Sequence, residues 1–215
     1  MIVIEQQTTA CGYSHDSKRY GPLEYYQPVF DAIATATAKG IIVVEAGGNG
    51  NVNLDSAYCE GLFDRSERDS GAIIVGAGSS QNRARMPFSS YGSRIDVQAW
   101  GENVVTTGYG DAFPTLDIRQ RYTLGFGGTS SATPMVAAAA IAIQGVRKAC
   151  GKPPLTPHHM RNLLVNTGAA QPAGEGHIGP MPRVDAALQS NPIAFCQPLP
   201  LPTLPPGGVI TSQVT

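Results

Sequence analysis

The sequence lacks the excess of one charge that binding to nucleic acid or to an acidic membrane surface requires. Its 215 residues carry 15 lysines and arginines against 16 aspartates and glutamates, for a net charge of -1, and the basic residues are scattered. We therefore predict no nucleic acid and no membrane among its partners. The longest apolar stretch, residues 136–143, is too short to span a bilayer.

Cofactor and metal signatures are also missing. The four cysteines form no CxxC pair and no cysteine–histidine cluster with the spacing of metal ligands. The glycine-rich residues 47–50 lack the lysine of a phosphate-binding loop, and residues 125–128 lack the spacing of a dinucleotide fingerprint. We predict no cofactor and no metal ligands, although the sequence alone does not decide whether a structural calcium ion is bound.

No secretory signal peptide is visible at the start of the chain. Instead, the apolar residues 1–4 predict a buried strand that begins at once. We therefore expect the domain to lack a segment that would precede this strand.

The order of the predicted elements favours an α/β fold. Residues 2–6 predict the first strand. Apolar runs at residues 41–45 and 72–77 are typical of parallel strands covered on both faces, and a predicted helix between residues 28 and 40 joins the first two strands. Shorter strands are expected at residues 95–99, 104–107 and 122–126, with a polar loop at residues 8–22. Strand–helix–strand units of this kind build a parallel sheet with helices on both faces.

The second half of the chain is predicted to be mainly helical. Residues 131–150 form a nearly all-apolar stretch, which predicts a helix buried on every side. Thr156 and Pro157 predict the start of a further helix, and residues 182–188 a last short one. We assign residues 1–190 to one domain and the proline-rich residues 191–215 to a tail or linker.

The four cysteines allow two interpretations. They could be buried free thiols, or they could form two disulfides in an exported protein. Cys11 and Cys59 lie in predicted loops at the same sheet edge. Cys150 ends the long helix, and Cys196 follows the last one. The predicted pairs are therefore Cys11–Cys59 and Cys150–Cys196.

The segment GGTSSATP, residues 127–134, brings a serine hydroxyl to the start of the long helix. A helix N-terminus carries unpaired N–H groups and a partial positive charge, which would stabilise an oxyanion formed beside Ser130. Gly128 would let a substrate backbone approach closely. The alternative is an ordinary serine cap after a glycine turn.

The segment EAGGNG, residues 45–50, ends a predicted buried strand. Ligands of α/β sheets bind beyond the carboxyl ends of the strands, where Asn49 lies. Its side-chain amide could donate a second hydrogen bond to an oxyanion. The alternative is a turn residue in a left-handed conformation.

Taken together, these motifs resemble those of the subtilisin-like serine protease family. GGTSSATP is similar to the family's signature around its nucleophile, and EAGGNG to the segment with its oxyanion asparagine. Residues 88–92 (FSSYG), 95–101 (IDVQAWG) and 155–168 resemble later family motifs in the same order. The resemblance covers residues 1–188 and implies a subtilisin-like fold, with Ser130 as nucleophile and Asn49 as oxyanion donor. It also implies that Glu45, Ala46, Gly47, Gly48, Gly128 and Thr129 line the substrate-binding site.

The chain departs from the family pattern at its front. The family's aspartate motif (DSG or DTG) and its histidine motif (of the HGT type) do not occur in this sequence. We therefore expect the chain to be an N-terminally truncated form of the fold that holds the catalytic serine. His15, in the polar loop, is the candidate substitute base, whereas His158, His159 and His177 are expected to be solvent-exposed.

Three functions stay open at this point. The first is a fragment of a secreted peptidase that cleaves peptide bonds through an acyl-enzyme on Ser130, together with the missing N-terminal portion. The second is a small complete hydrolase that acts on esters, and the third is an inactive peptide-binding protein. The unpaired strand at residues 1–6 is also expected to drive self-association.

Overall fold

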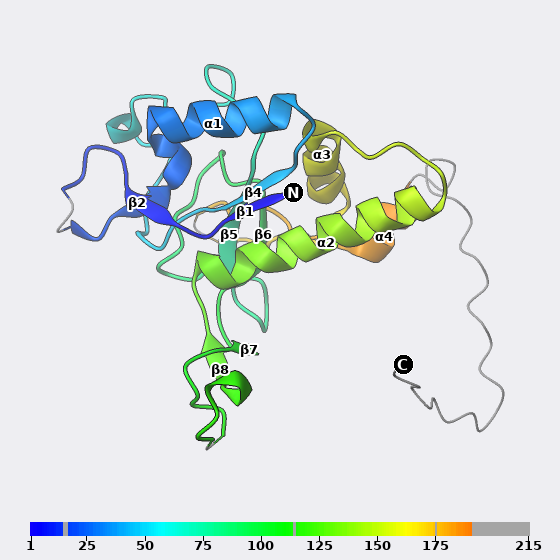
Figure 1. Cartoon of the computed structure of the whole chain (residues 1–215). Helices are drawn as coiled ribbons and strands as arrows, with labels where there is room; N and C mark the ends of the chain where they lie inside the picture. Colours follow the sequence, from blue (N-terminus) through cyan, green and yellow to red (C-terminus); the bar gives the residue numbers. More distant parts are fainter. Residues whose placement is uncertain (15–16, 114, 175, 191–215) are drawn as a thin grey trace.

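The centre of the molecule is a four-stranded parallel sheet in the order β1-β4-β5-β6 (Figure 1). The computed structural model describes residues 1–14, 17–113, 115–174 and 176–190. The strands are β1 (Ile2–Ile4), β4 (Val43–Ala46), β5 (Ile73–Gly78) and β6 (Val97–Trp100). All three pairings are parallel, which confirms the predicted α/β sheet.

Helices cover both faces of this sheet, as predicted. Because successive residues of a strand point to opposite faces, Val43 packs toward α1 (Gln27–Ala38) and Val44 toward α2 (Thr129–Ala149). Two further helices, α3 (Pro157–Thr167) and α4 (Val184–Ser190), complete the α2 side of the core. The predicted start of α3 is confirmed, because the Thr156 side chain accepts a hydrogen bond from the His159 N–H.

Two antiparallel hairpins lie outside the central sheet. β2 (Gln7–Thr9) pairs with β3 (Tyr20–Pro22) within the segment predicted to be only a polar loop. β7 (Val104–Thr107) pairs with β8 (Tyr122–Phe126), and this hairpin projects away from the body of the domain (Figure 1). Short 3₁₀ helices occur at η2 (Leu23–Tyr25), η3 (Ala57–Cys59) and η4 (Ile118–Gln120).

Helix α2 corrects the expectation of a helix buried on every side. Its residues Ala132, Val136, Ala140 and Ile143 are buried against the sheet, but Ile141 is 57% exposed. By length and composition α2 could cross a bilayer, although it packs on β4, β5 and β6. Alanine is small and weakly hydrophobic, so an alanine-rich helix can leave one side in solvent. The apolar composition therefore overstated the burial.

The structure contains the predicted disulfide between Cys11 and Cys59, whose Cα atoms lie 4.0 Å apart. It ties the β2–β3 hairpin region to the loop that follows β4. In the second predicted pair, Cys150–Cys196, Cys196 lies outside the described residues. The proposed tail or linker, residues 191–215, also lies outside them.

Candidate active site

The nucleophile candidate lies in the first turn of α2. The turn before it depends on Gly128, which has a φ of +89° and donates its N–H to the carbonyl of Gly101 at 2.9 Å. A Cβ at this position would lie 2.8 Å from the Asn49 Nδ2 atom. Glycine is therefore required here both by its backbone conformation and by its close contact with Asn49.

Asn49 is held against the same turn. Its Oδ1 atom accepts hydrogen bonds from the Thr129 N–H at 2.8 Å and from the Thr129 hydroxyl at 3.0 Å. A backbone N–H can only donate, so the atom facing it must be the oxygen. Nδ2, the donor end of the amide, is therefore the atom that lies beside Gly128. The two segments selected from the sequence are thus brought together.

Two more hydrogen bonds fix the backbone around Asn49. The Gly48 N–H donates to the Thr129 hydroxyl at 3.1 Å, and the Asn49 N–H donates to the Gln7 side-chain oxygen at 2.8 Å. Gly48 has a φ of +91°, and a Cβ on it would lie 2.6 Å from the Tyr20 carbonyl oxygen. Gln7 was not identified from the sequence, because it lies in β2 of the missed β2–β3 hairpin.

The Ser130 hydroxyl points to the N-terminal segment of the chain. It donates a hydrogen bond to the main-chain carbonyl of Glu5 at 3.1 Å. A carbonyl oxygen accepts a hydrogen bond but does not take up a proton at neutral pH, so this contact does not activate the serine.

The described histidines form no observed contact with Ser130. His158 interacts with Asn162 in the first turns of α3, and the backbone carbonyl of His177 accepts a hydrogen bond from Gly92. The proposed substitute base, His15, lies outside the described residues. Within the described ranges, no three histidine, cysteine or acidic side chains meet as metal ligands.

Substrate contact by Glu45 stays a prediction, and the position of its side chain does not support it. Residues alternate along β4, so its side chain points to the face opposite α2. There the carboxylate is fully buried and accepts a hydrogen bond from the Glu24 N–H at 2.8 Å. Its Oε2 atom has no hydrogen-bond partner, and burial together with the neighbouring Glu24 raises the pKa of Glu45 to about 8.

Substrate contact by the other predicted residues stays a prediction. Ala46, Gly47, Gly48 and Thr129 are buried in the structure, whereas Gly128 is half-buried. The Thr129 side chain is committed to Gly48 and Asn49, so its role toward substrate would be indirect.

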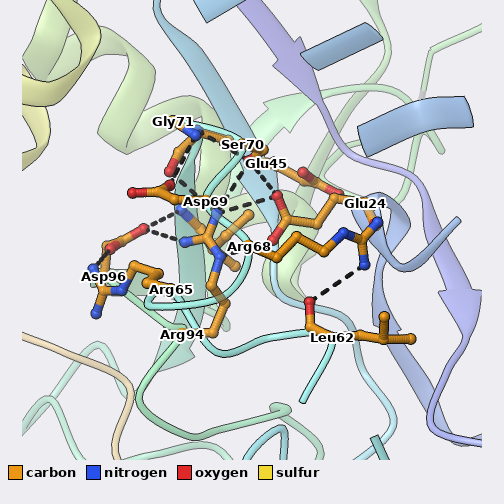
Figure 2. A network of polar contacts seen from close by, with 12 residues as sticks. Glu24, Glu45, Leu62, Arg65, Arg68, Asp69, Ser70, Gly71, Arg94 and Asp96 are labelled. Carbon is orange, nitrogen blue, oxygen red and sulfur yellow. Dashed lines mark hydrogen bonds and ion pairs between the residues drawn. The ribbon is translucent and has the colours of Figure 1, made fainter. Parts of the chain in front are cut away.

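Beside Glu45 lies a buried network of charged groups that the sequence did not reveal (Figure 2). Arg94 is fully buried and binds Glu24 at 2.7 Å and Asp96 at 2.9 Å. Arg65 binds the other oxygen of Asp96 at 2.6 Å. Glu24 also accepts a hydrogen bond from the Ser70 hydroxyl. The network thus links η2, the loop before β5 and the start of β6.

Residues 64–69 are mostly exposed, as expected for a charge-rich loop, yet three of their side chains bind groups outside the loop. Besides Arg65, the side chain of Arg68 donates to the Glu24 carbonyl at 3.0 Å. Asp69 binds Arg161 of α3 at 2.7 Å. Burial alone would raise the pKa of Asp69, but the Arg161 hydrogen bonds hold it well below its usual value.

The structure is an α/β fold with a serine in the first turn of helix α2 and an asparagine amide bound to the neighbouring Thr129. Residues 8–183 match the sequence profile of the peptidase S8, or subtilase, family. The chain therefore belongs to the subtilase family.

Relatives agree with this assignment. The chain is 31% identical to subtilisin Savinase of Lederbergia lenta over 150 residues, which cover 68% of this chain and 47% of that protein. It is 32% identical to alkaline elastase YaB of a Bacillus species, also over 68% of this chain but only 34% of the elastase. The chain thus spans about half or less of these relatives.

Solved structures show the same fold. A protease from Pseudoalteromonas arctica shares 25% identity, with a TM-score of 0.57 over 88% of this chain and 50% of that one. A lanthipeptide protease matches with a TM-score of 0.63 and 21% identity, covering 88% of this chain and 60% of that one.

Proposed function

We propose that this chain is the part of a subtilisin-like serine endopeptidase that holds the nucleophile and the oxyanion hole. Ser130 Oγ would attack the scissile peptide carbonyl and form an acyl-enzyme. The oxyanion would accept hydrogen bonds from the Ser130 N–H and from the Asn49 amide. The observation that carries this proposal is the pair of Thr129 hydrogen bonds that holds the Asn49 amide against the turn before Ser130, with its Nδ2 beside Gly128.

A general base is still required, and we propose that a further polypeptide segment supplies it. β1 is the edge strand of the sheet, and Glu5, which follows it, accepts the Ser130 hydrogen bond. A segment that pairs with β1 would therefore enter beside the serine. A histidine brought in this way would replace the Glu5 carbonyl as the acceptor of the Ser130 proton.

We further propose that the protein acts outside the cytoplasm on peptide or protein substrates. Its disulfide Cys11–Cys59 is of the kind that persists in oxidising compartments. Relatives from Dichelobacter nodosus and Xanthomonas campestris are named an extracellular basic protease and an extracellular protease. Of the two alternatives, the following experiment separates the peptide-binding function without a reactive serine, and the comparison of casein with p-nitrophenyl acetate separates the ester-hydrolysing one.

Labelling with a fluorophosphonate probe tests the nucleophile and its oxyanion hole. We expect slow modification of the chain, mapped by mass spectrometry to Ser130 and absent in Ser130→Ala. Asn49→Ala should slow the labelling by about 10²–10³-fold, the loss known for removal of an oxyanion donor in a subtilisin. Asn162→Ala, an exposed asparagine of α3, is the matched control. Labelling spread over other serines, or unaffected by Asn49→Ala, would contradict the proposal.

A further inference from the structure

The β7–β8 hairpin carries an apolar surface in solvent. Val105 is 62% exposed, Leu124 57% and Tyr122 39%. Phe113, from the loop that joins the two strands, places its ring 5.8 Å from that of Tyr122. We call these four residues the hairpin patch. Clustered apolar side chains on a projecting element are typical of an interaction surface.

The hairpin buries a polar residue and exposes apolar ones. Thr123 is 2% exposed, and its hydroxyl donates to Asp111 of the connecting loop at 3.0 Å. At an irregularity in the pairing, Leu124 and Gly125 stand opposite Val105. The polar threonine is therefore covered while its apolar neighbours face water. A hairpin without a partner would be expected to cover its apolar residues and expose its polar ones. We therefore expect the patch to bind a partner.

The position of the hairpin indicates which partner this is. β8 leads directly into the turn of Ser130, and Gly128 is hydrogen-bonded to Gly101 at the start of the hairpin. The Ser131 hydroxyl binds the Trp100 carbonyl at 2.8 Å, at the same place. Both ends of the hairpin are thus fixed to the turn that carries Ser130.

The composition and open edges of the hairpin favour an uncharged, extended ligand. The strands VVTT and YTLGF contain no charged residue. In the connecting loop, Arg119 and Asp117 form an ion pair with each other at 2.8 Å. A two-stranded sheet also leaves one backbone edge of each strand open for a further strand.

We infer that the hairpin patch is a docking arm for an apolar, extended stretch of the polypeptide substrate that flanks the bond cleaved at Ser130. This inference rests on the proposed function. It commits to substrate as the occupant because β8, which carries Tyr122 and Leu124, leads directly into the serine turn.

Binding to the full chain in its Ser130→Ala form tests this inference without turnover. The probes are two fluorescein-labelled 16-residue peptides, one with alternating valine, leucine and phenylalanine, the other with serine and threonine at those positions. We expect fluorescence anisotropy to show about tenfold tighter binding of the apolar peptide. The double variant Val105→Thr and Leu124→Thr should remove this preference, because threonine keeps the strand propensity but not the apolar surface.

Tyr58→Ser is the matched control, since Tyr58 is 72% exposed and lies in η3, after β4. The preference should survive in this variant. Equal binding of both peptides, or a preference that survives the double hairpin variant, would overturn the inference. A dimer in sedimentation velocity that is lost only in the hairpin variant would also overturn the inference, because a second copy of the chain would then occupy the patch. If the preference holds but fluorophosphonate labelling of Ser130 fails, the proposed reaction is wrong and the docking arm stands.

Discussion

The hydroxyl of Ser130 donates a hydrogen bond to the main-chain carbonyl of Glu5, 3.1 Å away. This contact joins the first turn of the core helix to the segment after the edge strand. The serine hydroxyl is thus hydrogen-bonded to a carbonyl oxygen, which cannot take up its proton at neutral pH.

The isolated chain is therefore expected to have negligible activity on proteins. A serine needs a base within hydrogen-bond reach, whereas an oxyanion hole by itself still gives about 10³–10⁴-fold acceleration over water. We predict no measurable cleavage of casein and at most weak hydrolysis of p-nitrophenyl acetate, the latter lost in Ser130→Ala.

Strong casein cleavage by the purified monomer, abolished by Ser130→Ala, would contradict this prediction. It would mean that the chain itself contains a working base. Single substitutions of His15, His158, His159 and His177 would then identify it.

Self-association through β1 is the second prediction. Ile2 and Val3 are each 41% exposed on this edge strand, next to an apolar groove lined in part by Ile41 and Ile141. An open edge beside an apolar surface favours pairing with another strand. We expect concentration-dependent association in sedimentation velocity, reduced by Val3→Lys. Tyr58→Lys, an exposed position away from the edge, should have no effect. A monomer at all concentrations would exclude this role for the edge.

Thr129 is predicted to support the site through its hydroxyl. This buried group accepts from Gly48 N–H and donates to Asn49. Thr129→Val keeps the shape of the side chain but leaves the Gly48 N–H without its partner, at a cost of about 1–3 kcal/mol. Urea denaturation should show this loss, and Thr129→Ser should restore most of the stability. Equal stability of the valine variant and the parent would show that the hydroxyl contributes nothing.

The pH dependence of stability should reveal the buried Glu45. Its pKa is raised by burial from 4.5 to about 8. Between these values the folded chain keeps a proton that the unfolded chain has released, so the contribution of Glu45 to stability falls as the pH rises from about 4.5 to 8. Above pH 8 this contribution no longer changes.

Glu45→Gln replaces the carboxyl group by an amide that stays neutral. The stability difference between Glu45→Gln and the parent should therefore shift in favour of the variant between about pH 5 and 8 and then become constant. Urea denaturation at a series of pH values measures this. Glu67→Gln, at an exposed carboxylate, is the control. Parallel curves for Glu45→Gln and the parent would show that Glu45 is not protonated in the folded state.

Local patterns were sufficient to predict most of the fold. The apolar runs around Val44 and Ile74 predicted buried parallel strands, because only a strand covered on both faces is apolar throughout. The β2–β3 hairpin was missed, since its polar residues show no alternation that favours a strand. The exposed side of α2 was missed because composition measures hydrophobicity and not which neighbours are present.

The sequence by itself determined the family, the core strands and the pairing of Asn49 with the serine turn. Each of these depends on residues whose chemistry is local, such as glycines that permit a turn and a serine at a helix start. Only the tertiary structure decided that the Glu45 side chain faces Glu24, and that Ser130 contacts Glu5. Those outcomes depend on which face of a strand a residue occupies and on what long-range packing brings there, and neither is encoded in a motif.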